Sequence, residues 1–371
     1  MTFSNVSFGD VTDNFDKKRI PLSAAQREKR QGKYRYYGAQ GVIDWVDDYI
    51  FDGTYLLIAE DGENLKSKKS NIAQLASGKF WVNNHAHVIQ CKKGYDIRYL
   101  CYLINLTDLS GYITGSAQPK LSQSSMNAIV LPMPKFEIQK EVADFIEKFD
   151  KKIQINEKIN DNLEQQAAAL FSSLYNRSNT EVRYTDLIQI LGGGTPKTGE
   201  TAYWNGNIAF FTPKDVGTPY TFITEKTITE EGLSHCNSRL YPVNTVFVTA
   251  RGTVGKVGLS GVPMAMNQSC YALVGKETHQ LLVYFYTLKA VDRLKHKASG
   301  AVFDAITTRD FDSEQIMKLS DDDAKAFLCV AEPMFQEILN NSIENLRLST
   351  LRDFLLPKLM SGEIDVSSVQ L

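Results

Sequence analysis

Two long stretches of the chain carry a helical pattern of apolar residues that the remaining sequence lacks. Lys135–Tyr175 contains no glycine or proline, and its apolar residues recur mostly at spacings of three and four. Asp321–Met360 carries a similar but less regular pattern. These spacings predict two helices, each on the order of 60 Å long, whose apolar seams pack against each other.

Two residues of these stretches qualify the helix prediction. Asn156 lies within the first seam, where a polar residue typically fixes the register of paired helices. Pro333 falls within the first turns of the second helix, so we expect a kink or a late helix start there. The first seam comprises Ile138, Val142, Phe145, Phe149, Ile153, Asn156, Ile159, Leu163, Ala167, Leu170 and Leu174. The second comprises Phe327, Val330, Met334, Ile338, Ile343, Leu346, Leu351, Leu355 and Leu359.

The rest of the chain alternates short strand patterns with turn residues. The stretch IFDGTYLLIAEDGEN (Ile50–Asn64) predicts a strand, a turn and a second strand, with a polar loop at its end. The stretch NTVFVTARGTVGKVG (Asn244–Gly258) predicts a strand that ends in a turn presenting Arg251 and Lys256 between glycines.

The two strand-rich parts resemble each other. VSFGDV (Val6–Val11) matches VRYTDL (Val182–Leu187), and TGSAQPKLSQSSM (Thr114–Met126) resembles SGAVFDAITTRDF (Ser299–Phe311). Their shared order and near-constant offset indicate a duplication. The second match pairs Gly115 with Gly300, Leu121 with Ile306, Ser122 with Thr307 and Met126 with Phe311.

The duplication and the helices together predict the architecture. We expect similar domains at residues 1–134 and 179–320, a central helix at 135–178 and a C-terminal helix at 321–371. The first helix leads from one domain to the other and the second leads back, so the pair should be antiparallel. The predicted fold is α+β: two similar mixed α/β domains joined by two long antiparallel helices that form a coiled coil, with pseudo-twofold symmetry. Such a molecule would measure the spacing of two sites, and duplex DNA offers a regular repeat.

Composition narrows the class of protein without naming a partner. The net charge of −2 argues for no particular ligand, and the slight positive excess lies in the two strand-rich parts. The five cysteines are scattered and form no C-x-x-C pair, which favours reduced thiols in a cytoplasm. No signal-peptide pattern opens the sequence, and no apolar run reaches the length of a membrane span.

The sequence motifs argue against most catalytic functions. LGGGTPKTGETAYW (Leu191–Trp204) has phosphate-loop spacing, but Glu200 replaces the lysine and the loop runs into a strand pattern rather than a helix. The chain lacks the Asn-Pro-Pro-aromatic or Asp-Pro-Pro-aromatic box with which methyltransferases hold a flipped adenine. It also lacks the Pro-Asp dipeptide and the Glu-x-Lys triplet that mark the commonest metal-dependent nucleases. His85 and His87 would share one strand face with Trp81 and Asn83, but with Cys91 they match no usual zinc spacing. We therefore expect no catalytic, cofactor or metal site.

The remaining polar loops suit binding of DNA. Arginine and lysine recognise guanine, asparagine and glutamine recognise adenine, and backbone amides hold phosphates. For any one of these residues, an ordinary solvated β-turn is the alternative. The candidate DNA-binding residues are Lys33, Arg35, Tyr36, Tyr37, Gln40, Asn64, Gln118, Lys120, Thr195, Lys197, Lys214, Arg251 and Lys256.

Four motifs in order resemble one family over essentially the whole chain. YYGAQGVIDWVDDYIFDGTYLLIAEDGEN and GGGTPKTGETAYWNGNIAFFTPKDVG are similar to the openings of target-recognition domains in type I restriction–modification specificity subunits. LPMPKFEIQKEVADFI and LRDFLLPKLMSGEI resemble the central and C-terminal conserved regions of that family. One departure is that LSDDDAKAFLCVAEP (Leu319–Pro333) lacks the family's usual entry to the second helix.

The resemblance implies a non-catalytic, cytoplasmic subunit that recognises DNA. Each domain would read one half of a split, asymmetric target, and the paired helices would set the gap. Helices Lys135–Tyr175 and Asp321–Met360 would dock two adenine methyltransferase subunits, which use S-adenosylmethionine and can recruit ATP- and Mg-dependent motor–nuclease subunits. Thr195, Lys197 and Lys214 would lie near a DNA backbone. The alternatives are a stand-alone DNA methyltransferase or nuclease with drifted motifs, or a two-domain adaptor that binds only proteins. The sequence does not specify the target.

Overall fold

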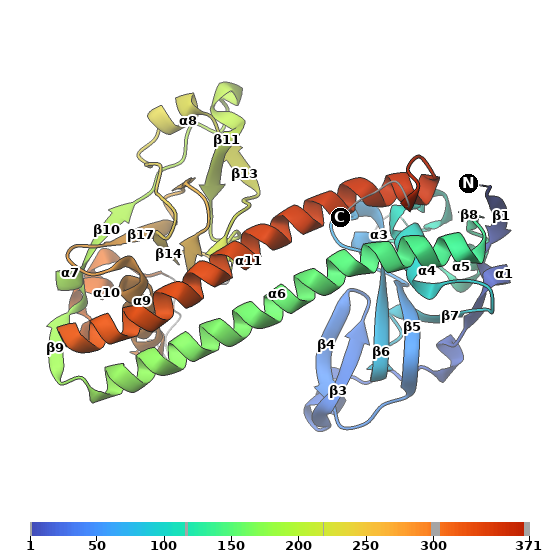
Figure 1. Cartoon of the computed structure of the whole chain (residues 1–371), viewed down its shortest axis with the longest axis horizontal. Helices are drawn as coiled ribbons and strands as arrows, with labels where there is room; N and C mark the ends of the chain where they lie inside the picture. Colours follow the sequence, from blue (N-terminus) through green and yellow to red (C-terminus); the bar gives the residue numbers. More distant parts are fainter. Residues whose placement is uncertain (1, 116–117, 218, 298–304, 367–371) are drawn as a thin grey trace. The chain divides into compact units, whose positions relative to one another are not determined.

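The computed structural model describes residues 2–115, 118–217, 219–297 and 305–366, which form two compact units (Figure 1). Unit 1 consists of Met1–Lys152 with Arg347–Leu371, and unit 2 of Ile153–Leu346. Two long helices, α6 (Phe136–Arg177) and α11 (Asp321–Ser361), each contribute residues to both units. Each unit therefore contains a strand-rich domain and a part of both helices.

Unit 1 is built on a six-stranded sheet in the order β2-β7-β5-β6-β3-β4. The central strand β5 is antiparallel to both of its neighbours, while β3 runs parallel to β6. A two-stranded ribbon of β1 (Ser4–Ser7) and β8 (Val130–Met133) leads into α6. The sheet strands are β2 (Thr12–Asn14), β3 (Gln31–Gly38), β4 (Gly41–Val46), β5 (Phe51–Ala59), β6 (Ala73–Val82) and β7 (Ala86–Cys91). The short helices are α1 (Phe8–Val11), α2 (Ala24–Glu28), α3 (Asn64–Ser67), α4 (Ile97–Leu106) and α5 (Gln123–Asn127).

Unit 2 is built on a five-stranded sheet in the order β10-β17-β14-β15-β12. A smaller sheet, β13-β11-β16, is attached to it, and a ribbon of β9 and β18 leads into α11. The main strands are β10 (Ile188–Gly192), β12 (Tyr220–Thr221), β14 (Val246–Thr249), β15 (Val257–Ser260) and β17 (Cys270–Gly275). The other strands are β9 (Thr180–Arg183), β11 (Trp204–Phe211), β13 (Lys226–Ile228), β16 (Met264–Met266) and β18 (Gln315–Lys318). The helices are α7 (Tyr184–Leu187), α8 (Glu230–Ser234), α9 (Gln280–Lys297) and α10 (Thr308–Ser313).

Five strands of the six-stranded sheet and the five strands of the other sheet have the same topology, and β4 alone has no counterpart, which confirms the duplication. The central strand, β5 in one sheet and β14 in the other, is antiparallel to both of its neighbours. Beyond one of these neighbours comes a parallel strand, β3 in the first sheet and β12 in the second. Beyond the other neighbour comes an edge strand, β2 or β10. A backbone clasp recurs just past the central strand, where Leu121 N–H donates to Glu60 at 2.8 Å and Ile306 N–H donates to Ala250 at 2.9 Å. The predicted pairing of Leu121 with Ile306 is therefore correct.

The side chains around the clasp repeat as well. Ser122 caps α5 and Thr307 caps α10, each accepting from the amide three residues on. Met126 and Phe311 are both fully buried beneath these short helices. The predicted pairings of these residues are thus also correct, whereas Gly300 lies outside the described residues.

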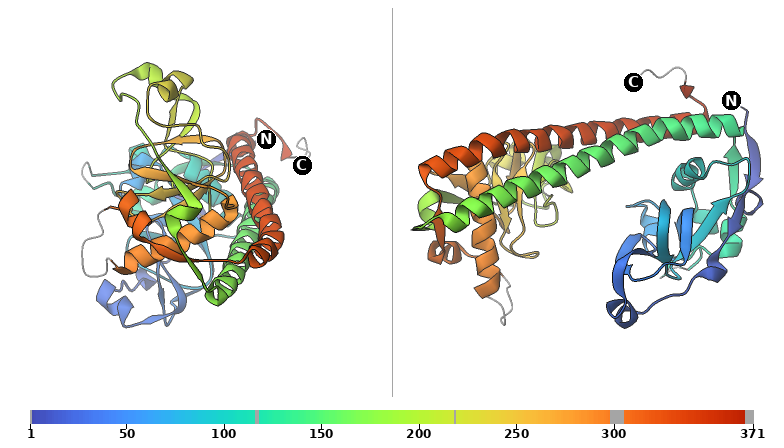
Figure 2. Two further views of the ribbon diagram at one scale, coloured as in Figure 1. Left: turned by 90° about the vertical axis from the view of Figure 1, so that its left-hand side faces the viewer. Right: turned by 60° about the horizontal axis from the view of Figure 1, so that its bottom comes forward.

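Both parts of the helix pair pack on their own domain and on each other. In unit 1, Phe145 and Phe149 of α6 share a core with Leu355 and Leu359 of α11 and with α4. In unit 2, Phe171 of α6 lies in a core with residues of α9 and α11. The helices lie side by side in each view (Figure 2), as the hydrophobic seams predict.

Within unit 2 the contact between the helices contains a polar layer. The buried Asn156 amide donates to Glu344 at 2.7 Å and to Asn345 at 2.8 Å. One turn further along α6, Asn160 accepts from Asn341 at 3.0 Å. The α11 partners fall in number as the α6 residues rise, so the helices are antiparallel here. Buried amide groups of this kind stabilise one register because any shift leaves them without partners.

Several local predictions are wrong. Ile159, Val330 and Leu351 are exposed by 41%, 44% and 42% rather than lying in the seams. The helix α11 does not start late, because it runs through Pro333 from Asp321.

The predicted turn within Ile50–Asn64 is also wrong, because β5 is one continuous strand through Gly53. Gly53 has a φ of 125°, and it pairs with Gly78 on β6, whose φ is 82°. Two glycines opposite each other allow the ladder to bend without a break, since neither has a side chain that opposes a positive φ.

Candidate nucleic-acid interface

Four loops of unit 2 meet at one end of its sheets. They are the glycine-rich loop after β10, the turn after β11, the turn after β14 and the turn between β16 and β17. Backbone hydrogen bonds connect them: Gly194 N–H donates to Met266 at 3.1 Å, Asn267 N–H to Phe211 at 3.0 Å, and Ala250 N–H to Ser269 at 2.8 Å. The four loops therefore form one surface.

The glycine-rich loop serves close backbone packing within this surface. A Cβ atom on Gly193 would lie 2.2 Å from the carbonyl oxygen of Asn267, and one on Gly194 would lie 2.7 Å from the amide nitrogen of Asn237. Both distances are below any real contact, so only glycine fits at these positions. The loop continues into a short 3₁₀ helix (Thr201–Tyr203) and β11, not into an α-helix. It therefore lacks the helix N-terminus that a phosphate loop uses.

The predicted residues of unit 2 fall on these loops. Thr195 donates a hydrogen bond to Gln268, which joins the glycine-rich loop to the β16–β17 turn. Lys214 is largely exposed and lies 3.7 Å from Glu225. Lys197, Arg251 and Lys256 are exposed. A groove of about 460 Å³ separates the loops, and its lining residues are Thr212, Pro213, Lys214, Glu225, Lys226, Gly252, Thr253 and Asn267.

Sequence reasoning missed three polar residues of this surface. Asn267 and Gln268 form the tip of the β16–β17 turn, and Lys226 lines the groove beside Lys214. The turn signal was present in MNQS, where three polar residues follow an apolar strand. It went unnoticed because its neighbours come from distant parts of the chain.

In unit 1 the corresponding end of the sheet carries Asp61, His85 and Lys120. The Asp61 carboxylate lies 2.7 Å from His85 Nδ1, and the Lys120 ammonium lies 3.3 Å from Glu60. Gln118, on the same loop as Lys120, and Gln40, at the tip of the β3–β4 hairpin, are exposed. The predicted Gln118 and Lys120 are thus brought next to the end of β5.

Three of the predicted DNA-binding residues of unit 1 have buried side chains. Tyr36 is fully buried, and its hydroxyl accepts from the Leu22 amide at 2.8 Å. Tyr37 packs edge-on against Phe80 in the core. Asn64 is 4% exposed, and its amide group donates to Ser70 at 2.8 Å. In this structure the three side chains pack within the domain rather than on its surface.

The exposed face of the β3–β4 hairpin instead presents Lys33, Arg35 and Trp45. Arg35 and Trp45 are cross-strand partners, and the Trp45 side chain is 49% exposed. Directly opposed residues project on the same face of a sheet. A basic and an aromatic side chain on one exposed face suit a phosphate backbone with adjacent bases.

A buried ionic network lies beneath the clasp of unit 1. His87 Nδ1 lies 2.6 Å from an Asp16 carboxylate oxygen and Nε2 lies 2.8 Å from the Leu121 carbonyl oxygen, so each ring nitrogen has a hydrogen-bond partner. Arg19 lies 2.9 Å from Glu60. Burial alone would raise the pKa of the Asp16 carboxyl, but hydrogen bonds and the positive charge of His87 lower it.

Asp16, Glu60 and His87 could in principle hold a metal ion, because one ligand atom of each lies within 4.8 Å of the others. However, Arg19 and Lys120 already neutralise the carboxylates, and both nitrogens of His87 are occupied by hydrogen bonds. The set fits an ion-pair network better than a metal site.

The strand face predicted for His85 and His87 is wrong. His85 lies in the turn that follows β6, and His87 lies on the next strand, β7. Burial raises the pKa of the nearby Cys91 thiol to about 12.

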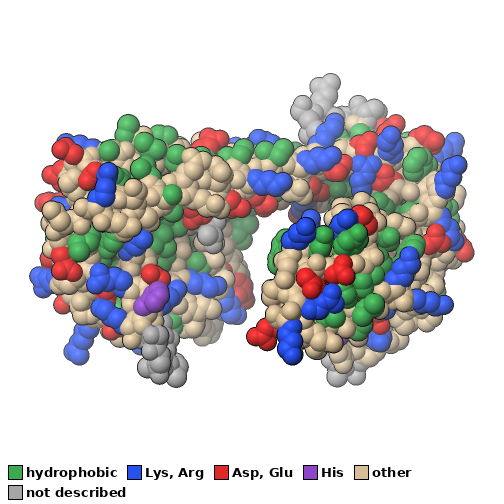
Figure 3. All heavy atoms as spheres, turned by 90° about the horizontal axis from the view of Figure 1, so that it is seen from below, with side chains coloured by type: hydrophobic (Ala, Val, Ile, Leu, Met, Phe, Trp, Pro, Cys, Tyr) green, Lys and Arg blue, Asp and Glu red, His purple; other side chains and the backbone are tan. Residues whose placement is uncertain are grey.

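Charges of both signs are mixed on the face of the protein that Figure 3 shows. Lysine and arginine side chains alternate with acidic ones on the face in Figure 3, without one continuous basic patch. This matches the weak positive excess of the sequence. Any DNA contact must therefore rely on particular side chains more than on a strong overall field.

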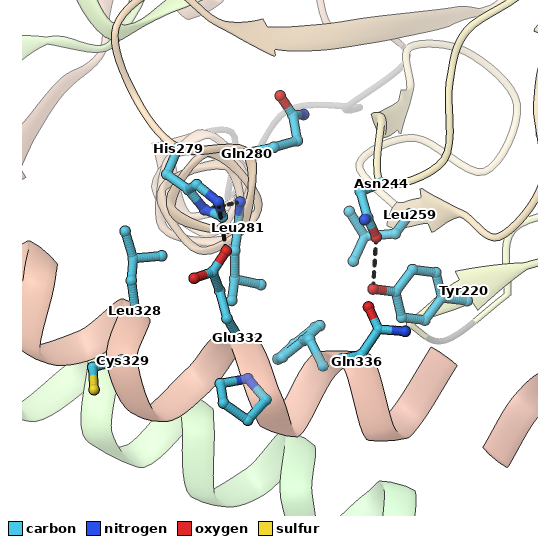
Figure 4. A pocket seen from close by; sticks show the side chains of 12 residues that line it. Tyr220, Asn244, Leu259, His279, Gln280, Leu281, Leu328, Cys329, Glu332 and Gln336 are labelled. Atoms are coloured by element: carbon cyan, nitrogen blue, oxygen red, sulfur yellow. Dashed lines mark hydrogen bonds and ion pairs between the residues drawn. The ribbon is translucent and has the colours of Figure 1, made fainter. Parts of the chain in front are cut away.

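A second cavity of unit 2, about 410 Å³, lies between the start of α9 and α11 (Figure 4). His279 and Glu332 form an ion pair at 2.8 Å on one side, and the Tyr220 hydroxyl donates to Asn244 at 2.8 Å on the other. Pro333 on α11 has no amide hydrogen, which leaves the Cys329 carbonyl without its helical donor. The His279–Glu332 pair connects α11 to the loop before α9 at this cavity.

Comparisons with known proteins give one consistent match. The family model described as "Type I restriction modification DNA specificity domain" matches residues 2–165 and 176–318. A putative type I restriction enzyme specificity subunit of Haemophilus influenzae is 30% identical over 37% of this chain and 35% of its own length. The MjaIX specificity subunit of Methanocaldococcus jannaschii is 32% identical over 32% and 29%. These two alignments span about a third of each relative.

Two longer matches cover nearly the whole chain. The HindI specificity subunit of Haemophilus influenzae is 24% identical over 98% of this chain and 95% of its own. The crystal structure of the S subunit of a type I restriction-modification system from M. genitalium has a TM-score of 0.61. That structure is 14% identical and covers 97% of this chain and 96% of its own, which shows a shared fold. Across residues 2–115, 118–217, 219–297 and 305–366, no helix is long and apolar enough to cross a membrane.

Proposed function

Because the chain belongs to the family of type I restriction modification DNA specificity domains, we propose that it is the DNA-recognition subunit of a restriction–modification complex. Each strand-rich domain reads one half of a split, asymmetric target. The observation that carries this proposal is the pair of sheets with the same topology but different side chains on equivalent loops. A duplicated scaffold with different loops suits recognition of two different half-sites.

The helices α6 and α11 set the gap between the half-sites, as an antiparallel coiled coil related by pseudo-twofold symmetry, and dock two adenine methyltransferase subunits. Exposed apolar side chains on these helices support the docking. Ile155, Ile159 and Val330 in unit 2 and Leu351 and Phe354 in unit 1 are all more than 40% exposed. Apolar groups in such numbers on a polar helix surface favour a protein partner.

The chemistry belongs to the partners. The methyltransferase subunits bind S-adenosylmethionine, and motor–nuclease subunits bind ATP and Mg²⁺, while this chain holds no cofactor and acts in the cytoplasm. Arg35, Lys33, Gln40, Gln118 and Lys120 contact DNA from one domain. The second domain contributes Thr195, Lys197, Lys214, Arg251 and Lys256.

The test is to express the chain with its methyltransferase partner in a host without adenine methylation and to map modified adenines across the genome. We expect a motif of two defined parts separated by a fixed undefined gap. A one-part motif, or no motif, would contradict the proposal. Methylation by the purified chain alone with S-adenosylmethionine would instead support a stand-alone methyltransferase.

A second experiment addresses the adaptor alternative. The complex with the methyltransferase should bind DNA tightly in a gel-shift assay, and binding should weaken steeply with salt through counterion release. The isolated chain should bind weakly because its charges are nearly balanced. A complex that never shifts DNA would favour a purely protein-binding adaptor.

A further inference from the structure

The backbone clasps identify one equivalent position in the two domains. Asp61 is the second residue past the end of β5, and Arg251 is the second residue past the end of β14. Each forms an isolated bridge to the residue before the clasp donor: Asp61 to Lys120, and Arg251 to Ala305. The two side chains therefore start from the same point of the same scaffold.

The side chains at this position have opposite hydrogen-bonding roles in the two domains. Asp61 is a hydrogen-bond acceptor, and since a carboxylate cannot donate, His85 Nδ1 supplies the proton of their 2.7 Å contact. Only the Asp61 Oδ2 atom takes part in this contact, and Oδ1 remains for another donor. Arg251 is a donor. Within the described ranges its exposed guanidinium has no hydrogen-bond or ion-pair partner.

The neighbours of the position are polar groups of the candidate interface. The Asp61 end of β5 adjoins Lys120, and Gln118 lies on the same loop. The Arg251 turn adjoins Ser269 at 3.3 Å through its backbone, next to Gln268 and Asn267. The backbone under each side chain is thus held by main-chain bonds, on a loop next to other polar residues of the candidate interface.

We infer that this strand-end position determines specificity in both domains: Asp61 accepts from the exocyclic amine of cytosine, and Arg251 donates to guanine. A carboxylate matches the N4 amine of cytosine in the major groove, and a guanidinium matches O6 and N7 of guanine in a bidentate pair. The inference rests on the proposed function, since it assigns a base to a loop of that recognition subunit. Each half-site then contains a C·G pair at the contacted position.

The test uses methylation maps of cells that express the complex with single variants. Arg251→Ala should lower discrimination for one guanine of one half-site about tenfold or more, and leave the other half-site unchanged. Asp61→Ala should relax one cytosine of the other half-site. Asp61→Asn should shift that position towards adenine, because an asparagine amide matches the N6 and N7 atoms of adenine.

Matched controls use the same residue types elsewhere in each domain. Asp52→Asn changes an exposed aspartate at the opposite end of β5, and Arg183→Ala changes an exposed arginine paired with Asp186 at 3.2 Å. Both should keep the wild-type motif. An unchanged motif in Asp61→Ala or Arg251→Ala, with full methylation, overturns the inference.

The experiment also separates the two proposals. Absence of a two-part motif with the wild-type chain would reject the proposed function, whereas a wild-type motif that the variants leave intact would reject only the base assignment. A variant complex without methylation is assayed by binding to targets substituted at each position. Equal affinity loss on every target would count against the inference, and loss confined to the wild-type base would support it.

Discussion

The domain of unit 1 and the domain of unit 2 share a sheet topology. They differ in the side chains that lie behind the candidate interface at one end of the sheet. Unit 1 has a charged network below its clasp, formed by Asp16, Arg19, Glu60 and His87. In unit 2 the position equivalent to Glu60 is Ala250, and an apolar core lies behind the loops. The two domains therefore share the backbone hydrogen bonds of the clasp but differ in the side chains around it.

The sharpest way to break this comparison is to exchange a whole domain. Replacing residues 1–134 by the same region of a relative should replace one half-site completely and leave the other intact, because each domain has its own core. Methylation mapping of cells that carry the chimaera measures the outcome. If both half-sites change together, the domains do not read DNA independently.

The next largest effect concerns the helices that the two domains share. Four residues inserted within Lys151–Gln166 of α6 add about one turn, or about 6 Å. Because only one of the paired helices grows, and DNA rises about 3.4 Å per base pair, we expect one to two more base pairs in the gap.

Inserting two residues at the same place is the matched control. It rotates the seam by about 200° and buries Glu157 and Lys158, so methylation should fall sharply. The bases read at each end should not change with the four-residue insertion. An unchanged gap with full activity would show that the helices do not set the spacing.

A smaller effect is expected on the stability of each domain when one arginine is removed. Arg19→Ala leaves the partly buried carboxylates of Asp16 and Glu60 less compensated, so it should destabilise unit 1 by about 2 kcal/mol. Arg183→Ala in unit 2 removes an exposed ion pair and should cost less than about 1 kcal/mol. Amide hydrogen exchange in β7 and in β17 reports each unit separately. Equal protection losses in both strands would contradict a network local to unit 1.

The same network predicts a dependence on acid. The pKa of Asp16 is lower in the folded chain than its ordinary value of 3.8. Its contribution to stability is therefore present above the unfolded value and is lost as the pH falls through the lowered folded value. Denaturant unfolding of the wild type and of Asp16→Asn below pH 4.5 should show a steeper loss in the wild type. Parallel curves would mean that Asp16 does not contribute.

The smallest effect is expected from a single phosphate contact. Lys214→Ala should weaken binding of the complex about equally on all DNA sequences, and should reduce the slope of log affinity against log salt by about one. Titrations at several salt concentrations measure this. A change in the recognised bases would instead make Lys214 a base-reading residue.

Much of the fold follows from the sequence because periodicity and repetition are properties of the chain itself. The helices, their antiparallel contact and the pairing of Leu121 with Ile306 come from patterns that local spacing determines. The exposure of Ile159 was not predictable in this way, since Asn160 contributes the contact at that turn through partners on a distant helix.

The candidate site was harder to predict than the fold. Tyr36 and Tyr37 are adjacent on one strand, yet both are buried, because a register shift between them in the β3–β4 ladder breaks simple alternation. Asp16, Glu60 and His87 are far apart in sequence and meet only through the sheet. Composition gives no information on which polar residues meet in space.

The clasps past β5 and β14 consist of main-chain atoms alone. The amide and carbonyl groups that hold each loop tip are the same whichever side chain stands there, so a substitution at Asp61 or Arg251 leaves these backbone bonds in place. If Asp61 and Arg251 read bases as we infer, new DNA targets arise by point mutation at these positions while the backbone bonds persist. The capacity to change the recognised bases would then depend on the backbone bonds of the clasp, which both copies of the domain have kept since the duplication.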